Sequence, residues 1–180
     1  MKLTDGEKLI ALMLSDLYEK LDVKSEIDPE FIRSAIYGDQ LWALKWKYSG
    51  IPFEKSDTPE IVKEVVDILD MWSFIERGYR KLTNVQKEKL KVDAPPHGDN
   101  PVFQGFDGNN ETEHMAVALF LVEELDRFQE FSDRDFNCHY QSLDGHRRML
   151  SVFESIRKTL NTNPLNIVQL TKILGAWYVR

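Results

Sequence analysis

The residues with the greatest chemical capacity lie in one short segment, F-Q-G-F-D-G-N-N-E-T-E-H, residues 103–114. Within it, Glu111 and His114 form an E-x-x-H pair, whose side chains would share one face of a helix and are suitable metal ligands. Di-iron helical bundles use two such pairs and two further glutamates, but this sequence contains one pair. A mononuclear metal site would therefore have to recruit Asp107 or His97.

A calcium loop is a second interpretation of the same segment. Asp107, Asn109 and Glu111 stand at alternate positions, as the first ligands of an EF-hand loop do. That loop also requires glycine at its sixth position and glutamate at its twelfth, where this chain has Thr112 and Ala118. The glycine spacing of phosphate-binding and dinucleotide-binding loops is missing as well. These mismatches argue against all three kinds of site.

The segment is explained more simply as the start of a helix. Asn110 is a good N-cap, Glu111 falls in the first turn, where the helix dipole favours an acid, and Glu113 has the spacing of a capping box. Asp107 and Gly108 favour a turn, in which Gly108 would relieve backbone strain. We name this group the helix-start motif: Gly105, Phe106, Asp107, Gly108, Asn110, Glu111 and Glu113.

An architectural helix-start motif has consequences for burial. We expect Phe103 and Phe106 to hold the loop on the core, and the carboxylates of Asp107 and Glu111 to face solvent. The sequence then contains no complete catalytic constellation, and we predict no catalytic residue, no bound metal and no cofactor. A metal-dependent enzyme or a metal-binding protein using this segment is kept as the alternative.

Cys138 is the single cysteine, and with His139 and His146 it suggests a thiol nucleophile or a zinc site. The spacing is too loose for a paired ligand motif, so we do not favour either. One cysteine excludes an intramolecular disulfide, and the opening M-K-L-T-D-G-E lacks the apolar region of a signal peptide, so we expect a cytoplasmic protein. The longest apolar run, residues 115–122, is far shorter than the ~20 residues of a membrane span, which predicts no membrane partner.

Basic residues gather in two stretches, residues 77–91 and 147–158. If the two converged, they could bind RNA or an acidic partner, with Trp72 or Tyr79 available for stacking. The net charge of −7 opposes a general affinity for nucleic acid, because binding to phosphates requires basic surface. We therefore expect a solvated face and keep binding through residues 77–91 as a second alternative.

Helices must position these residues, because apolar residues recur at steps of three and four and no useful alternating strand pattern is present. We predict an all-α fold, a compact bundle of about six helices with little or no β structure. One domain should span residues 1–180, with a long internal loop near residues 92–110. The expected helices cover residues 5–21, 29–48 and 59–78, a short stretch from 83, residues 111–125 and 142–160, and a last helix from 163.

The first two of these helices carry more apolar surface than packing on one core requires. An exposed apolar patch of that width promotes aggregation unless a partner covers it. We therefore predict a homodimer buried around Leu12, Trp42 and Trp46, or binding of another protein through the same residues. The function expected on these grounds is a non-enzymatic, self-associating or protein-interaction module with a regulatory role.

Several stretches of the chain resemble the YfbU family of small bacterial proteins. They are G-F-D-G-N-N-E at residues 105–111, the helix at 115–125, D-R-F-Q-E-F at 126–131, R-R-M-L at 147–150, L-T-D-G-E-K-L-I at 3–10 and E-V-V-D-I-L-D-M-W at 64–72. The resemblance spans almost the whole chain and implies a helical domain. The family is one of unknown function without an established catalytic residue, substrate or cofactor, so the resemblance adds nothing to the choice between the functions above.

Overall fold

The computed structural model describes residues 1–54, 57–160 and 163–178. Within these ranges the fold is all-α, as predicted: eight α-helices and two short helical segments are present, without a β-strand. A lone bridge pairs Phe106 with Asn137. The elements are α1 (Asp5–Lys20), α2 (Pro29–Tyr37), α3 (Trp42–Lys47), α4 (Glu60–Arg80), α5 (Asn84–Asp93), α6 (Thr112–Leu119), the π-helical η1 (Phe120–Glu124), the 3-10 turn η2 (Gln129–Phe131), α7 (Leu143–Arg157) and α8 (Ile167–Gly175).

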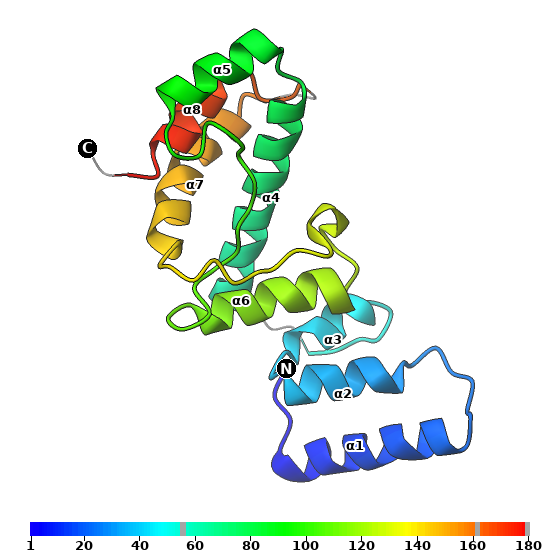
Figure 1. The fold of residues 1–180 in the computed structure, drawn as a ribbon. Coiled ribbons are helices and arrows are strands. Elements are labelled where there is room, and N and C mark those ends of the chain that lie inside the picture. The colour runs from blue at the N-terminus through cyan, green and yellow to red at the C-terminus, as the bar shows by residue number, and fades with distance from the viewer. Residues whose placement is uncertain (55–56, 161–162, 179–180) are drawn as a thin grey trace.

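The helices are arranged along an elongated molecule (Figure 1). The helices α1, α2 and α3 occupy one end, and α5, α7 and α8 surround the second half of α4 at the other. Between them, α6 packs against α4. At the first end α2 lies between α1 and the rest of the chain, so α1 forms the outermost layer.

The long helix α4 is the centre of the core. It packs against α6, α7 and α8, and Val65, Ile68 and Trp72 are among its fully buried side chains. One connected set of buried apolar residues extends from α4 through Phe120 to α2 and α3. This continuity supports the single domain expected from the sequence, which we retain as a proposal.

Local capping signals in the sequence predict several helix starts correctly. Thr4 and Glu7 form a capping box at the start of α1, and Thr83 and Gln86 form another at the start of α5. Asp28 caps α2 through two backbone N–H groups. These signals succeed because all partners lie within three residues of the cap.

The prediction of one helix over residues 29–48 is wrong. The helix α2 ends at Tyr37, and the chain turns through Gly38 and Asp39, whose φ of 55° is incompatible with a continuing right-handed helix. The turn allows α3 to begin at Trp42 and to pack that indole against Phe120. Burial of a large aromatic side chain therefore outweighs the hydrogen bonds of a continuous helix.

Two further boundaries differ from expectation. The last helix begins at Ile167 and not after Asn163, because Asn166 forms a capping box with Gln169. The helix expected over residues 111–125 changes at Phe120 from α-helical to π-helical geometry and ends at Glu124. Between α5 and α6, residues 94–111 form turns and irregular chain, where the sequence predicts a long loop near residues 92–110. No helix in the described residues is long and apolar enough to cross a membrane.

Candidate functional site

The carboxylate of Glu111 joins the helix-start motif to the beginning of α7. Its Oε1 accepts the N–H groups of Ser142 and Leu143, both at 2.8 Å. Its Oε2 accepts the Asp107 N–H at 2.9 Å and the Ser142 hydroxyl at 2.8 Å. Ser142 is the N-cap residue of α7, and its own side chain does not cap that helix. Glu111 therefore supplies the acceptors that the first N–H groups of α7 require.

Hydrogen bonds determine the charge of Glu111. Burial would raise the pKa of its carboxyl group, but the hydrogen bonds from Asp107, Leu143 and Ser142 outweigh burial and leave the pKa below its ordinary value. A carboxylate has about four acceptor sites, and here four donors occupy them. Glu111 consequently has no acceptor site left for a metal ion or a substrate proton.

Asp107 closes the turn that precedes α6. Its Oδ2 accepts the Asn110 side-chain amide at 2.6 Å, and its Oδ1 accepts the Asn109 N–H at 2.9 Å. These two bonds, the one from Asn110 above all, hold the pKa of Asp107 below its ordinary value. Asp107 and Glu111 are only 3% and 8% exposed, so the expectation that both acids face solvent is wrong. Burial is tolerated because each carboxylate is hydrogen-bonded.

The structure also corrects the capping role assigned to Asn110. Its side chain donates to Asp107, and the N-cap position of α6 is Glu111. No side chain makes a capping hydrogen bond at the start of α6, so the capping box expected with Glu113 is missing. The helix-start motif is an interlocked turn fixed to α7, and not a local helix cap.

Glycine is required in this turn at Gly105, for a reason different from the one expected. Gly105 has a φ of 92°, and a Cβ atom there would lie 2.0 Å from the Phe136 carbonyl oxygen. Gly108 lacks a positive φ, so the strain assigned to it is not observed; a Cβ at this position would instead meet the Asn137 side chain at 2.6 Å. Asn137 occupies that space because its Oδ1 accepts the Gly108 N–H.

The two phenylalanines hold the turn on the core, in agreement with expectation. Phe106 is fully buried and Phe103 nearly so, and their ring centroids lie 5.6 Å apart. The backbone of Phe106 exchanges hydrogen bonds with the loop between η2 and α7, donating to the Phe136 carbonyl at 2.8 Å and accepting the Cys138 N–H at 3.0 Å. The motif is thus fixed by its aromatic side chains and by its backbone.

His114 belongs to a different cluster, which joins three helices. Its Nε2 lies 2.9 Å from an oxygen of Glu64 on α4, and Arg147 on α7 binds the same carboxylate through two hydrogen bonds of 2.6 and 3.0 Å. These bonds lower the pKa of Glu64, with the Arg147 hydrogen bond as the largest cause. The cluster connects α4, α6 and α7 through these hydrogen bonds and pairs His114 with Glu64, not with Glu111.

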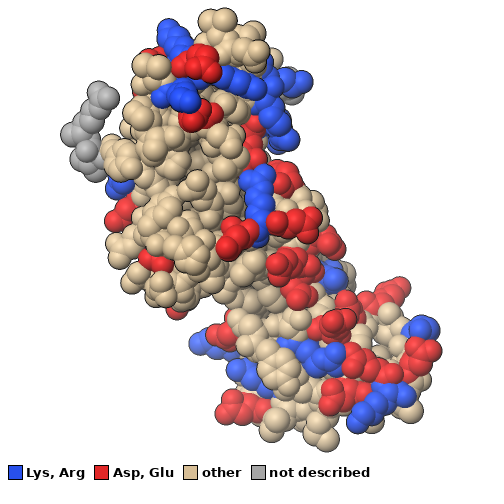
Figure 2. Space-filling view, viewed as in Figure 1, with Lys and Arg blue, Asp and Glu red and all other residues tan. Residues whose placement is uncertain are grey.

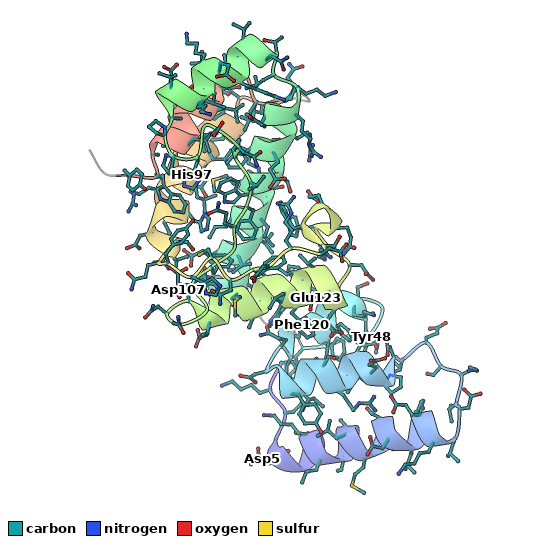
Figure 3. All side chains as sticks on the ribbon, in the orientation of Figure 1. Asp5, Tyr48, His97, Asp107, Phe120 and Glu123 are labelled. Atoms are coloured by element: carbon teal, nitrogen blue, oxygen red, sulfur yellow. The ribbon has the colours of Figure 1, made fainter. Side chains whose placement is uncertain are left out.

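His97 lies apart from the helix-start motif, as the labels of Figure 3 show for His97 and Asp107. Its ring packs edge-on against Trp177, with centroids 4.4 Å apart, and burial lowers its pKa. The enclosed Nε2 has no hydrogen-bond partner. A shallow cavity of about 380 Å³ adjoins it, lined by Pro96, His97, Asn100, Gln104, Tyr140, Trp177 and Tyr178. Its lining contains no carboxylate or basic side chain that could work with the histidine.

The four candidate metal ligands therefore do not form one site. Glu111 is occupied by N–H and O–H donors, His114 is paired with Glu64, and His97 is packed beside Trp177. Among the residues that the structure describes, no three His, Cys, Asp or Glu side chains are grouped so that they could hold a metal ion. The geometry gives the metal-site interpretation of residues 103–114 no support.

The thiol and zinc interpretation around Cys138 has no geometric support either. The Cys138 thiol donates to the Tyr140 carbonyl at 3.0 Å. His146 is buried in the core, where its Nδ1 accepts the Trp72 indole N–H at 3.1 Å and its Nε2 donates to the Gly105 carbonyl at 3.2 Å. Burial lowers the pKa of His146 to about 4, so the ring is neutral and structural at pH 7.

The two basic stretches have different surroundings. In the second, Arg147 pairs with Glu64, Arg157 pairs with Asp70, and Arg148 donates to the Trp177 carbonyl. These arginines are directed at neighbouring elements and do not extend the basic surface of residues 77–91. Figure 2 shows Lys and Arg around α5 and the end of α4, with acidic side chains among them.

The largest unexplained feature is the outward surface of α1. Its single buried residue is Ser15, whose hydroxyl bonds the Ala11 carbonyl, so α1 approaches α2 with small side chains. Arg33 of α2 pairs with Glu19 and fixes the two helices together. The opposite side, which we name the α1 apolar face, consists of side chains that are 50–71% exposed: Leu9, Ile10, Met13, Leu14, Leu17 and Leu21.

The residues predicted to form the dimer interface lie elsewhere. Trp42 is 8% exposed and packs within the chain against Trp46 and Phe120. Trp46 is partly buried beneath the guanidinium of Arg127, and Leu12 is partly buried as well. The apolar residues expected on the second helix therefore pack inside the chain, whereas many of those on the first helix remain exposed to solvent. The small residues at positions 11 and 15 were the sequence signal for this difference.

Comparison with known proteins gives an assignment without a known activity. The model of the YfbU domain family matches residues 1–176. A UPF0304 protein of Methanocaldococcus jannaschii is 31% identical over 96 residues, which cover 51% of this chain and 54% of that protein, so the match spans about half of each. The family match extends over nearly all of the described fold, including the helix-start motif and α1. The chain belongs to the YfbU family.

Proposed function

We propose that this protein is a non-enzymatic interaction module that self-associates through the α1 apolar face and acts in regulation. The observation that carries the proposal is the exposure of six large apolar side chains on one helix at the end of the molecule (Figure 1). The single free thiol, Cys138, suits a reducing compartment such as the cytoplasm.

Energetic considerations favour a covered α1 apolar face. Full burial of one Leu, Ile or Met side chain stabilises a protein by ~1.5–3 kcal/mol. A contiguous row of such side chains in water is typical of a binding surface or of a protein that aggregates. Figure 2 shows an uncharged strip along the outer edge of α1 with charged side chains beside it, which is the usual arrangement of an interface centre and its rim.

The enzymatic alternative has weaker support. A catalytic site needs polar groups that converge on a cavity with free hydrogen-bonding capacity. At the helix-start motif the acceptors of Asp107 and Glu111 are engaged by the protein's own donors. The polar lining of the cavity beside His97 consists of one histidine, two amides and two tyrosines, without a carboxylate.

RNA or acidic-partner binding also has weaker support. Convergence of the two basic stretches would favour it, but Arg147 and Arg157 of α7 are paired with acids of α4. Along residues 77–91, Lys91 is paired with Asp99. Arg77 and Lys87 lie over the rings of Phe74 and Tyr79, and the chain as a whole has a net charge of −7.

Size-exclusion chromatography with light scattering tests the proposal. We expect the unmodified protein to elute as a dimer at micromolar concentration, and Met13→Glu to convert it to a monomer, because a charge would then be buried at the interface. Val85→Glu is the matched control, since Val85 is 81% exposed on α5, away from α1. A monomeric unmodified protein, or a dimer that both substitutions leave intact, would reject the proposed surface.

A further inference from the structure

We infer that two copies of this chain pair through antiparallel α1 helices, with Met13 beside the two-fold axis and Asp5 facing Lys20 of the partner subunit. The inference rests on the proposed self-association and adds the identity of the occupant and its orientation. Three properties of α1 lead to it: the spacing of its apolar residues, the positions of its charges and the size of its exposed surface.

The apolar spacing on α1 fits another helix. Each of these apolar residues has another one three or four positions away, which places them in one stripe along the helix: Ile10, Met13, Leu14, Leu17 and Leu21. Such a stripe is the seam that a second helix covers in coiled coils and four-helix bundles. The helix α2 already covers the opposite side of α1, so a pair of copies would bring together four helices in a bundle.

The charges of α1 favour a second copy in the antiparallel orientation. Asp5 lies in the first turn and Lys20 in the last, and neither forms an ion pair within the described part of the chain. At 3.6 residues per turn the two are about 60° apart around the helix axis, so both border the same edge of the apolar stripe. In an antiparallel pair this edge of one helix lies against the same edge of the partner helix, and the two run in opposite directions. Asp5 is thereby brought close to Lys20 of the partner subunit.

A parallel pair would lose this charge pairing. Its two-fold axis runs along the helices, so the edge that carries Asp5 and Lys20 would face the opposite edge of the partner and the two charges would not meet. The helix dipoles would also be aligned side by side, which is unfavourable. The midpoint between positions 5 and 20 falls between residues 12 and 13, beside Met13 of the α1 apolar face.

The exposed surface suits the centre of a symmetric interface. The six side chains of the α1 apolar face are each 50–71% exposed, and an interface of standard size, ~800 Å² per partner, adds polar rim residues around such a centre. An apolar groove of about 190 Å³ between α1 and α2 adjoins the face at Leu14 and extends it towards Ile32. A two-fold pair uses one patch twice, so no second complementary surface is needed.

Cysteine cross-linking in a Cys138→Ser background distinguishes the orientations. We expect Met13→Cys to form a disulfide-linked dimer under mild oxidation. Leu9→Cys alone and Leu17→Cys alone should remain uncross-linked, whereas the mixture of these two proteins should cross-link, because position 9 faces position 17 of the other copy. A parallel pair predicts the reverse: each single variant links to itself and the mixture gains nothing.

The same proteins are measured by sedimentation under reducing conditions, which separates the two proposals. Dimers that fail to cross-link through Met13→Cys, or that show the parallel pattern, would overturn the antiparallel inference and leave self-association intact. Monomers would reject both. As a second readout, Asp5→Lys and Lys20→Glu should each weaken the dimer a few-fold, and the double variant should restore it; a double variant as weak as the singles contradicts the pairing.

Discussion

Glu111 at the start of α6 and Ser142 at the start of α7 share two hydrogen bonds of 2.8 Å, from the backbone N–H and from the hydroxyl of Ser142. The two residues lie 31 positions apart in the chain. This contact locks the helix-start motif against α7 and makes Glu111 a structural carboxylate. It changes what substitutions in the motif are expected to do.

Glu111→Gln should destabilise the protein by about 2–4 kcal/mol, because an amide cannot accept from all four donors and brings two N–H groups of its own towards them. Urea unfolding followed by circular dichroism measures the difference. Glu113→Gln is the control, since Glu113 is exposed and neighbouring; it should change stability by less than about 0.5 kcal/mol. Equal effects of the two substitutions would contradict the role of Glu111.

Phe106→Ala should cost about 3–5 kcal/mol through the cavity it leaves. Asn110→Ala removes one hydrogen bond to Asp107 and should cost about 1 kcal/mol. Because the Glu111 carboxylate is buried and fully hydrogen-bonded, its substitution should cost nearly as much stability as Phe106→Ala and clearly more than Asn110→Ala. Thermal unfolding of the three variants at pH 7 tests the order, and a Glu111 variant milder than the Asn110 variant would contradict it.

The burial of His146 should make the protein less stable at mildly acidic pH. The pKa of His146 is about 4 in the folded protein and 6.5 ordinarily. Between pH 4 and 6.5 this side chain is therefore protonated in the unfolded chain and neutral in the folded one. Stability is therefore full above pH 6.5 and falls as the pH drops towards 4, by up to about 3 kcal/mol. Urea midpoints from pH 7.5 to 4.5 should show this fall in the unmodified protein and a smaller one in His146→Gln. Identical slopes would show that His146 is not the responsible group.

Gly105→Ala should destabilise by more than about 2 kcal/mol, because its φ of 92° strains any other residue and its Cβ would overlap the Phe136 carbonyl. Gly50→Ala is the matched control, since a Cβ atom at Gly50 would have no neighbour within 4 Å. The free energies of unfolding of the two variants are compared. A tolerated Gly105→Ala would mean that the backbone at Gly105 does not lie this close to the Phe136 carbonyl.

The sequence predicted features that depend on neighbouring residues. The capping boxes of Thr4 with Glu7 and of Thr83 with Gln86 follow from residues three apart, and the all-α fold follows from apolar spacing. The turn at Asp39 depends on the burial of Trp42 against Phe120, which is distant in sequence. No local pattern indicates that contact.

The candidate sites show the same limit. The pairing of Glu111 with Ser142 and of His114 with Glu64 links residues 31 and 50 positions apart, so the local pattern E-x-x-H suggested a shared site that the fold separates. The broad apolar surface of α1 was visible in the sequence. The small residues at positions 11 and 15 indicate which side of this helix can pack closely, but that α2 is the helix packed there follows only from the structure.

Sedimentation equilibrium over a dilution series measures whether a second copy covers the α1 apolar face. We expect a mass of twice the 21.0 kDa chain at micromolar concentration. The mass should approach that of one chain on dilution or in Met13→Glu, and stay dimeric in Val85→Glu. A single-chain mass for the unmodified protein at every concentration up to about 100 μM, well above the Kd of a standard-size interface, would show that no second copy covers this face.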